Sequence, residues 1–64
     1  ERQSLLKRAI KRLPDRQRQV FLLKHKEGLK ISEIAEVFGC PQGTVKANLF
    51  KAIRNLKNSM EDIK

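Results

Sequence analysis

Apolar residues recur along this chain with the spacing of helices, and three breaks separate the helical segments. The breaks fall at Leu13-Pro14, Glu27-Gly28 and Gly39-Cys40-Pro41. No stretch of useful length alternates apolar and polar residues with period two, so we expect no strand. The pattern predicts an all-α fold of four helices.

The first two segments are short amphipathic helices on either side of Pro14. In the first, the apolar positions are Leu5, Leu6, Ala9, Ile10 and Leu13. Pro14 ends this helix because the residue before a proline avoids the α region. The second helix then begins with Asp15 as its cap or with Pro14 in its first turn, and the sequence leaves both possibilities open. It carries the apolar run 20–23, and Gly28 is expected to stop it.

The third and fourth segments each have one apolar face. In the third, positions i, i+3, i+4 and i+7 are Ile31, Ile34, Ala35 and Phe38. Glu33 falls in its first turn, where the helix dipole favours an anion. In the fourth and longest segment, the apolar stripe consists of Val45, Leu49, Ala52, Ile53, Leu56 and Met60.

The spacing of three residues around the last break predicts a helix-turn-helix. Ala35 is small enough to sit where two helices cross closely, and Gly39 can take the positive φ that a tight reversal needs. Val45 then has the right offset to anchor the second helix on the first. We therefore expect one domain over residues 1–64, with the helix-turn-helix at 31–57.

The charge indicates a polyanionic partner. The chain of 64 residues has a net charge of +8, with fifteen basic and seven acidic residues. Residues 1–26 hold nine basic groups and two acidic ones, whereas residues 27–45 hold one and three. Clustered Lys and Arg favour nucleic acid, because phosphate binding releases counterions. An anionic membrane surface would use the same charges, and charge alone does not separate the two.

Nothing in the sequence points to catalysis, a metal or a cofactor. His25 and Cys40 are the only residues of their kinds and lie in different segments. One cysteine forms no internal disulfide and fits a reducing compartment. No apolar run approaches the roughly 20 residues of a membrane span. The chain begins at Glu1 and not at Met, so we expect a piece of a longer protein. Because no catalytic set is present in the sequence, we expect a binding module and not an enzyme.

If the helix-turn-helix is correct, the fourth helix is a recognition helix whose first turns enter the DNA major groove. The residues on its polar face are Gln42, Thr44, Lys46, Ala47, Asn48, Lys51 and Arg54. Lys can reach guanine acceptors, Asn and Gln can pair with adenine, and the Ala47 methyl can meet a thymine methyl. Thr44 and the free N–H groups of the first turn suit a phosphate. Gly43 allows close approach of DNA or, alternatively, packs against the third helix.

At these residues the chain resembles a known family. The stretch LPDRQRQVFLLKHKEGLKISEIAEVFGCPQGTVKANLFKAIRNL, residues 13–56, is similar to region 4 of bacterial sigma factors, especially the extracytoplasmic-function type. The carrying pieces are Leu13-Pro14, the run 16–23, Glu27-Gly28-Leu29, Glu33-Ile34-Ala35 and the segment 39–46. The resemblance covers about two-thirds of the chain. It implies a bacterial, cytoplasmic protein that binds the promoter −35 element and docks on the flap of the RNA polymerase β subunit. Many members of the family are also held inactive by an anti-sigma factor that covers this domain.

The resemblance also implies roles for individual positions. The DNA-facing segment corresponds to Lys46, Ala47, Asn48, Phe50 and Lys51. Residues implied to contact DNA phosphates are Arg16, Arg18, Lys30 and Arg54.

Three positions depart from the family pattern. Ala47-Asn48 stands where the family often has Ser-Arg, which removes a cation and changes the expected −35 sequence. Lys30 stands where many members have a capping Ser, and a lysine accepts no hydrogen bond from the first turn. Ile53 replaces a basic residue, and we expect it to pack in the core.

Two alternatives remain at the level of sequence. Response-regulator output domains of the LuxR type also carry Thr-Val-Lys in the recognition helix, but Leu13-Pro14 and the Gly39-Cys40-Pro41 turn differ from that family. The chain could also be a sigma-like interaction module that binds an anti-sigma factor, with its DNA face lost. The absence of Arg at positions 48 and 53 keeps this second possibility open.

Overall fold

The computed structural model describes the backbone over residues 2–62 and the side chains over residues 5–59. The four predicted helices are α1 (Arg2–Arg12), α2 (Asp15–His25), α3 (Ile31–Phe38) and α4 (Gln42–Asp62). The described part contains no strand, which confirms the all-α prediction. No described helix is both long and apolar enough to cross a membrane. The predicted core position Met60 lies outside the described side chains.

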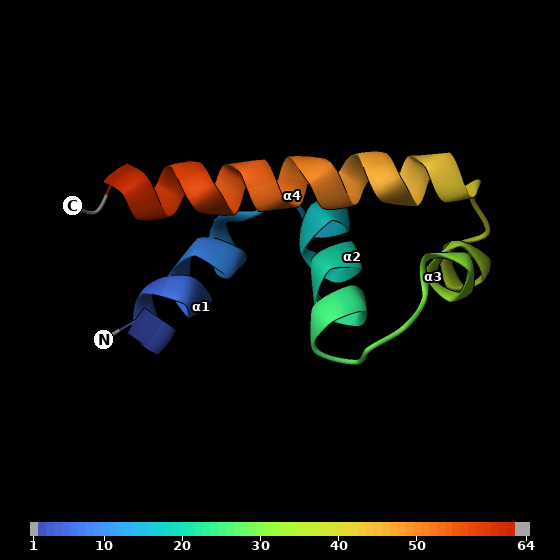
Figure 1. Cartoon of the computed structure of the whole chain (residues 1–64), viewed down its shortest axis with the longest axis horizontal. Coiled ribbons are helices and arrows are strands. Elements are labelled where there is room, and N and C mark those ends of the chain that lie inside the picture. The colour runs from blue at the N-terminus through green and yellow to red at the C-terminus, as the bar shows by residue number, and fades with distance from the viewer. Residues whose placement is uncertain (1, 63–64) are drawn as a thin grey trace.

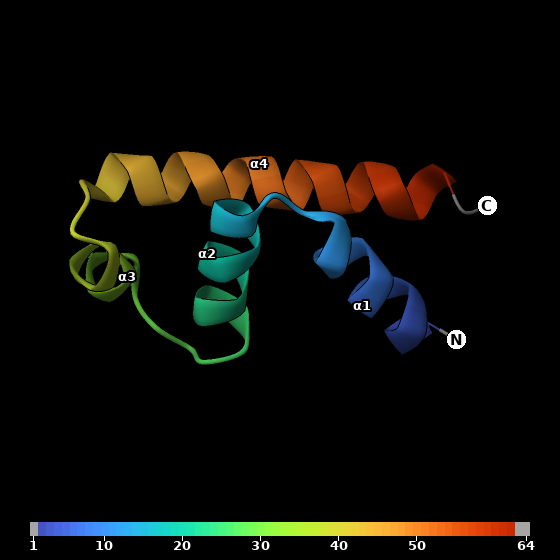
Figure 2. The same ribbon diagram turned by 180° about the vertical axis from the view of Figure 1, so that it is seen from behind.

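The longest helix forms one side of the molecule. α4 has 21 residues, a length of about 31 Å, and the molecule measures 37 × 18 × 15 Å. Figures 1 and 2 show α1, α2 and α3 along the same side of α4, with α3 near its N-terminal end, α2 near its middle and α1 near its C-terminal half. The opposite side of α4 is therefore left uncovered by any other helix.

The core consists of two apolar clusters under α4. One cluster joins α1 to the C-terminal half of α4 through Ala9, Leu13, Ala52 and Leu56. The other joins α2, α3 and the start of α4 through Val20, Ile34, Ala35 and Val45. Ala35 and Val45 are 6% and 1% exposed, so the predicted close approach of α3 and α4 is confirmed. No polar or charged side chain among the described residues is buried, so the core that they form is entirely apolar.

Neither sequence-based alternative for the start of α2, with Asp15 as the cap or Pro14 in the first turn, is correct, because the cap is Pro14 itself. Pro14 is the N-cap residue of α2, with φ −54° and ψ 150°, and its carbonyl accepts a hydrogen bond from the Arg18 N–H at 2.9 Å. Asp15 is the first helical residue and not the cap. Its carboxylate pairs with the Arg18 guanidinium at 2.7 Å, which places the anion near the positive end of the helix dipole.

The turn between α3 and α4 depends on Gly39. This residue adopts φ 64°, a left-handed conformation that glycine takes without steric penalty. The Cys40 N–H donates to the Ala35 carbonyl at 3.0 Å, and the Gly39 N–H donates to the Glu36 carbonyl at 3.2 Å. These two bonds form a Schellman motif, which satisfies the last carbonyls of α3. The prediction for Gly39 is confirmed, and the turn directs α4 across α3. Gly28 also has a positive φ, 73°, but α2 already ends at His25.

Two apolar residues lie outside the faces expected for them. Leu6 is 38% exposed, and Ile53 is 44% exposed. α4 meets the core with Val45, Leu49, Ala52 and Leu56. Ile53 follows Ala52 by one residue and is therefore rotated by about 100° from it around the helix. The expectation that Ile53 packs in the core is wrong.

Candidate nucleic-acid interface

The uncovered side of α4 displays most of the residues predicted to contact DNA. Val45 and Ala52 are buried beneath the helix. The exposed side chains over residues 42–54 are Gln42, Thr44, Lys46, Ala47, Phe50, Lys51, Ile53 and Arg54. Because residues three and four apart share a helix face, Lys46 and Phe50 form one edge of this surface and Ala47 and Lys51 form the other. We call this surface, residues 42–54 on the uncovered side, the α4 outer face.

The charge of the α4 outer face has one sign. The charged residues of α4 with described side chains are Lys46, Lys51, Arg54 and Lys57, and all are cations. The ion pair found among the described side chains joins Arg18 to Asp15 on α2. Among the described side chains the α4 cations have no carboxylate partner, and a surface of this charge suits a phosphate.

Asn48 differs from its neighbours on the helix. It is half-buried, and its side-chain amide donates to the Thr44 carbonyl one turn earlier at 3.1 Å. One of the two amide N–H groups is therefore used within α4, and the second N–H and the amide oxygen remain for an external group. A paired contact with adenine uses one amide N–H and the oxygen together, so Asn48 would make it through its second N–H.

Gly43 lies in the first turn of α4 with open space around it. A Cβ added there would meet no atom within 4 Å. The alternative that Gly43 is required for packing against α3 is therefore wrong. The Thr44 and Val45 N–H groups donate to the Pro41 carbonyl at 3.0 and 3.4 Å, so the N–H groups of Gln42 and Gly43 are the ones that an external group can reach in this turn.

Lys30 lies at the start of α3 and keeps its side chain free. As the N-cap residue, it donates its backbone N–H to the Glu33 Oε1 at 2.8 Å. Glu33 therefore supplies one half of a capping box, whereas the Lys30 ammonium has no lone pair for the other half. The side chain of Lys30 is exposed.

The two arginines of α2 predicted to contact phosphates already have partners within the fold. The guanidinium carbon of Arg16 lies 4.3 Å from the centroid of the Phe38 ring, a cation–π contact between α2 and the end of α3. Arg18 pairs with Asp15 and reaches the Lys11 carbonyl at 3.5 Å. A phosphate would have to share these guanidinium groups with the contacts they make in the fold.

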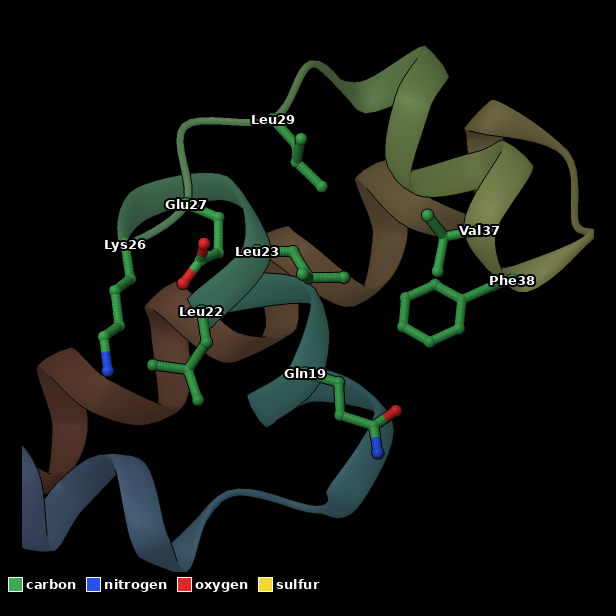
Figure 3. A pocket seen from close by; sticks show the side chains of 8 residues that line it. All are labelled: Gln19, Leu22, Leu23, Lys26, Glu27, Leu29, Val37 and Phe38. Atoms are coloured by element: carbon green, nitrogen blue, oxygen red, sulfur yellow. The ribbon is translucent and has the colours of Figure 1, made fainter.

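A concave surface that was not predicted from the sequence lies between α2 and α3. Its volume is about 620 Å³, and Figure 3 shows the side chains of α2, the following loop and α3 that line it. We call it the α2–α3 groove, and its apolar lining residues are Leu22, Leu23, Leu29, Val37 and Phe38. Val37 is 64% exposed. The signal was present in the sequence, because four consecutive apolar residues at 20–23 cannot all face the core and Val37 falls outside the apolar face of α3.

The sequence of the chain matches those of known proteins. The profile of the family described as "Sigma-70, region 4" matches residues 3–56. The chain is 32% identical over 63 residues to the ECF RNA polymerase sigma-E factor of Escherichia coli (strain K12), covering 98% of this chain and 33% of that protein. It is 33% identical over 54 residues to the protein of the same name from Haemophilus influenzae, covering 84% of this chain and 29% of that protein.

The chain thus spans about a third of the length of the curated relatives that it matches. The family match extends from α1 into the buried part of α4 and includes the whole turn at Gly39. The chain belongs to the Sigma-70, region 4 family.

Proposed function

We propose that this chain is the promoter-binding region 4 of an alternative, extracytoplasmic-function type sigma factor and reads the −35 element in the bacterial cytoplasm. In this proposal residues 1–64 form one domain, and the helix-turn-helix at 31–57 carries α4 into the major groove. The observation that carries the proposal is the α4 outer face, an uncovered helix surface with cations that have no partner among the described side chains.

Phosphate contacts would orient α4 before any base is read. The residues proposed for this role are Arg16, Arg18, Lys30, Thr44 and Arg54. Lys30 and Thr44 are exposed at the starts of α3 and α4, and the open backbone around Gly43 lets a phosphate approach the first-turn N–H groups.

Base readout would come from the first three turns of α4. The residues proposed for this role are Gln42, Lys46, Ala47, Asn48, Phe50 and Lys51. Lys46 and Lys51 lie on opposite edges of the α4 outer face, so they would reach guanine acceptors at different base pairs. The Ala47 methyl and the Phe50 ring would meet apolar groups between them. Neither the phosphate contacts nor the base readout proposed here needs a metal or a cofactor.

The α2–α3 groove would receive RNA polymerase through an apolar segment of the β flap. No residue of α4 lines this groove, so DNA on the α4 outer face leaves it accessible. An anti-sigma factor that covers the same groove would compete with polymerase. The family match leaves the LuxR-type alternative without support, whereas the groove also suits a sigma-like interaction module, which would need no DNA readout.

Selection of duplexes from a randomised pool at stepped salt concentrations tests this proposal. We expect one short asymmetric motif to be enriched and retained at moderate salt. Replacing Lys46 or Lys51 by Ala should weaken binding to that motif by about 1–3 kcal/mol where the lysine reads a base. Lys7→Ala, an exposed lysine on α1, is the matched control and should bind like the parent. Retention that vanishes with salt and enriches no motif would contradict DNA readout and favour the interaction module.

The groove is tested separately with Val37→Lys. Val37 is exposed, and a cation in the last turn of α3 suits the helix dipole, so the fold should tolerate this change. We expect the variant to lose binding to a β-flap fragment while it still binds the selected duplex. Equal flap binding by the parent and the variant would contradict this use of the groove.

A further inference from the structure

An apolar depression lies at the edge of the α4 outer face, where α4 meets α3, and the contacts proposed above use only part of its lining. It encloses about 230 Å³ and is lined by Ile31, Lys46, Leu49, Phe50 and Ile53. Phe50 is 75% exposed and Ile53 is 44% exposed. These two residues are three apart and therefore adjacent on the helix surface, with Ile31 of α3 beside them.

The fold itself does not require Phe50 and Ile53 to be apolar. The core beneath α4 is completed by other residues, with Val45 at 1% and Ala52 at 0% exposure. Isolated apolar side chains on a surface are common, but a contiguous apolar depression is a feature of interaction sites. A ligand for this depression should therefore carry an apolar group.

The surrounding charges restrict the class of that ligand. Lys46 lines the depression, and Lys57 lies one turn beyond Ile53 on α4. The other α4 cations, Lys51 and Arg54, are also without a carboxylate partner among the described side chains. An apolar site with one cation in its lining and further cations on the same helix suits a polyanion that presents apolar groups. In the major groove of duplex DNA that apolar group is the C5-methyl of thymine.

We propose that Phe50 and Ile53, with Ile31 beside them, form a thymine-methyl site that sets sequence preference on one edge of α4. This inference rests on the proposed DNA-binding function and deepens it. Phe50 and Ile53 are separated by about 4.5 Å along the helix axis, between one and two base steps of about 3.4 Å. The pair would therefore contact thymines at neighbouring base pairs, while Lys46 reaches the adjacent base edge or phosphate.

Replacement of thymine by deoxyuridine tests this site directly, because the two bases differ only in the methyl group. Each thymine of the selected duplex is replaced in turn, and affinities are measured for the parent, Phe50→Ala, Ile53→Ala and Lys51→Ala. We expect the parent to lose about fourfold in affinity at one or two positions, as for one buried methyl group. Phe50→Ala and Ile53→Ala should each abolish the loss at one of them. Lys51→Ala should weaken binding to the thymine duplex and to the deoxyuridine duplex by the same factor, so the ratio of the two affinities stays that of the parent.

Both apolar substitutions remove exposed side chains, so the variants should fold, and their thermal melts should match that of the parent within a few degrees. Equal affinities for thymine and deoxyuridine at every position, with the motif still selected, would overturn the thymine-methyl site and leave the proposed function intact. A parent that selects no motif would overturn the proposed function and this inference with it. Loss of polymerase binding in Ile53→Ala, with thymine and deoxyuridine bound equally, would assign the depression to a protein partner and overturn the inference as well.

Discussion

Val45 anchors α4 to α3, so replacing it by alanine should loosen the helix-turn-helix itself. The side chain is 1% exposed and packs with Val20, Ile34 and Ala35. Val45→Ala removes two buried carbon groups, each contributing about 0.8 kcal/mol of transfer free energy, and leaves a cavity. We therefore expect the free energy of unfolding to fall by about 2–3 kcal/mol. A chain of this size has only about 3–10 kcal/mol in total, and its melting temperature should fall by about 10–20 °C.

The same substitution at Val37 is the matched control. Val37 is on α3, one turn from the buried Ile34, but is 64% exposed. Val37→Ala should change the free energy of unfolding by less than about 0.5 kcal/mol. Urea unfolding followed by circular dichroism measures both variants. The reasoning is refuted if Val45→Ala is as stable as the parent, or if the two substitutions are equally destabilising.

Three further predictions concern the turn, the recognition helix and the α2–α3 contact. Gly39→Ala should destabilise the fold by about 1–2 kcal/mol because its φ is 64°. Gly43→Ala should leave the stability unchanged or raise it in the same urea unfolding assay, and it should weaken DNA binding. A Gly43→Ala variant that is less stable than Gly39→Ala would contradict both roles. Asn48→Ala should leave the fold intact and relax selection at one base pair; an unchanged motif would restrict Asn48 to its bond with the helix backbone. Arg16→Ala should lower stability by about 0.5–1 kcal/mol through the lost contact with Phe38. If Arg16 contacts a phosphate through its charge, Arg16→Lys should recover the DNA affinity that Arg16→Ala loses. The salt dependence of DNA binding by the two variants measures this.

The helices and the turn followed from the sequence because their determinants are local. Apolar spacing marked α1 to α4, and the positive φ at Gly39 follows from the single residue type that takes it freely at a helix end. Ala35 and Val45 were also recognisable, since a close crossing requires a small residue and an aliphatic anchor. The buried side chains at these positions confirm both expectations.

The errors came from features that depend on how the helices are arranged. Ile53 was assigned to the core stripe because it is apolar, but the stripe was already complete with Ala52 and Leu56, which leaves Ile53 at the surface. The α2–α3 groove needs the relative placement of two helices, which periodicity within each helix does not contain. The use of Asn48 within α4 and of Arg16 on Phe38 likewise depends on rotamers and on tertiary contact.

In the proposed complex the α4 outer face contacts DNA while the α2–α3 groove stays free. Amide chemical shifts of the chain, recorded by ¹H–¹⁵N spectroscopy during titration with the selected duplex, test it most directly. We expect the largest changes over residues 42–54 and at Lys30, with little change at Leu22 or Val37. Large changes confined to the α2–α3 groove, with the amides of residues 42–54 unmoved, would contradict it.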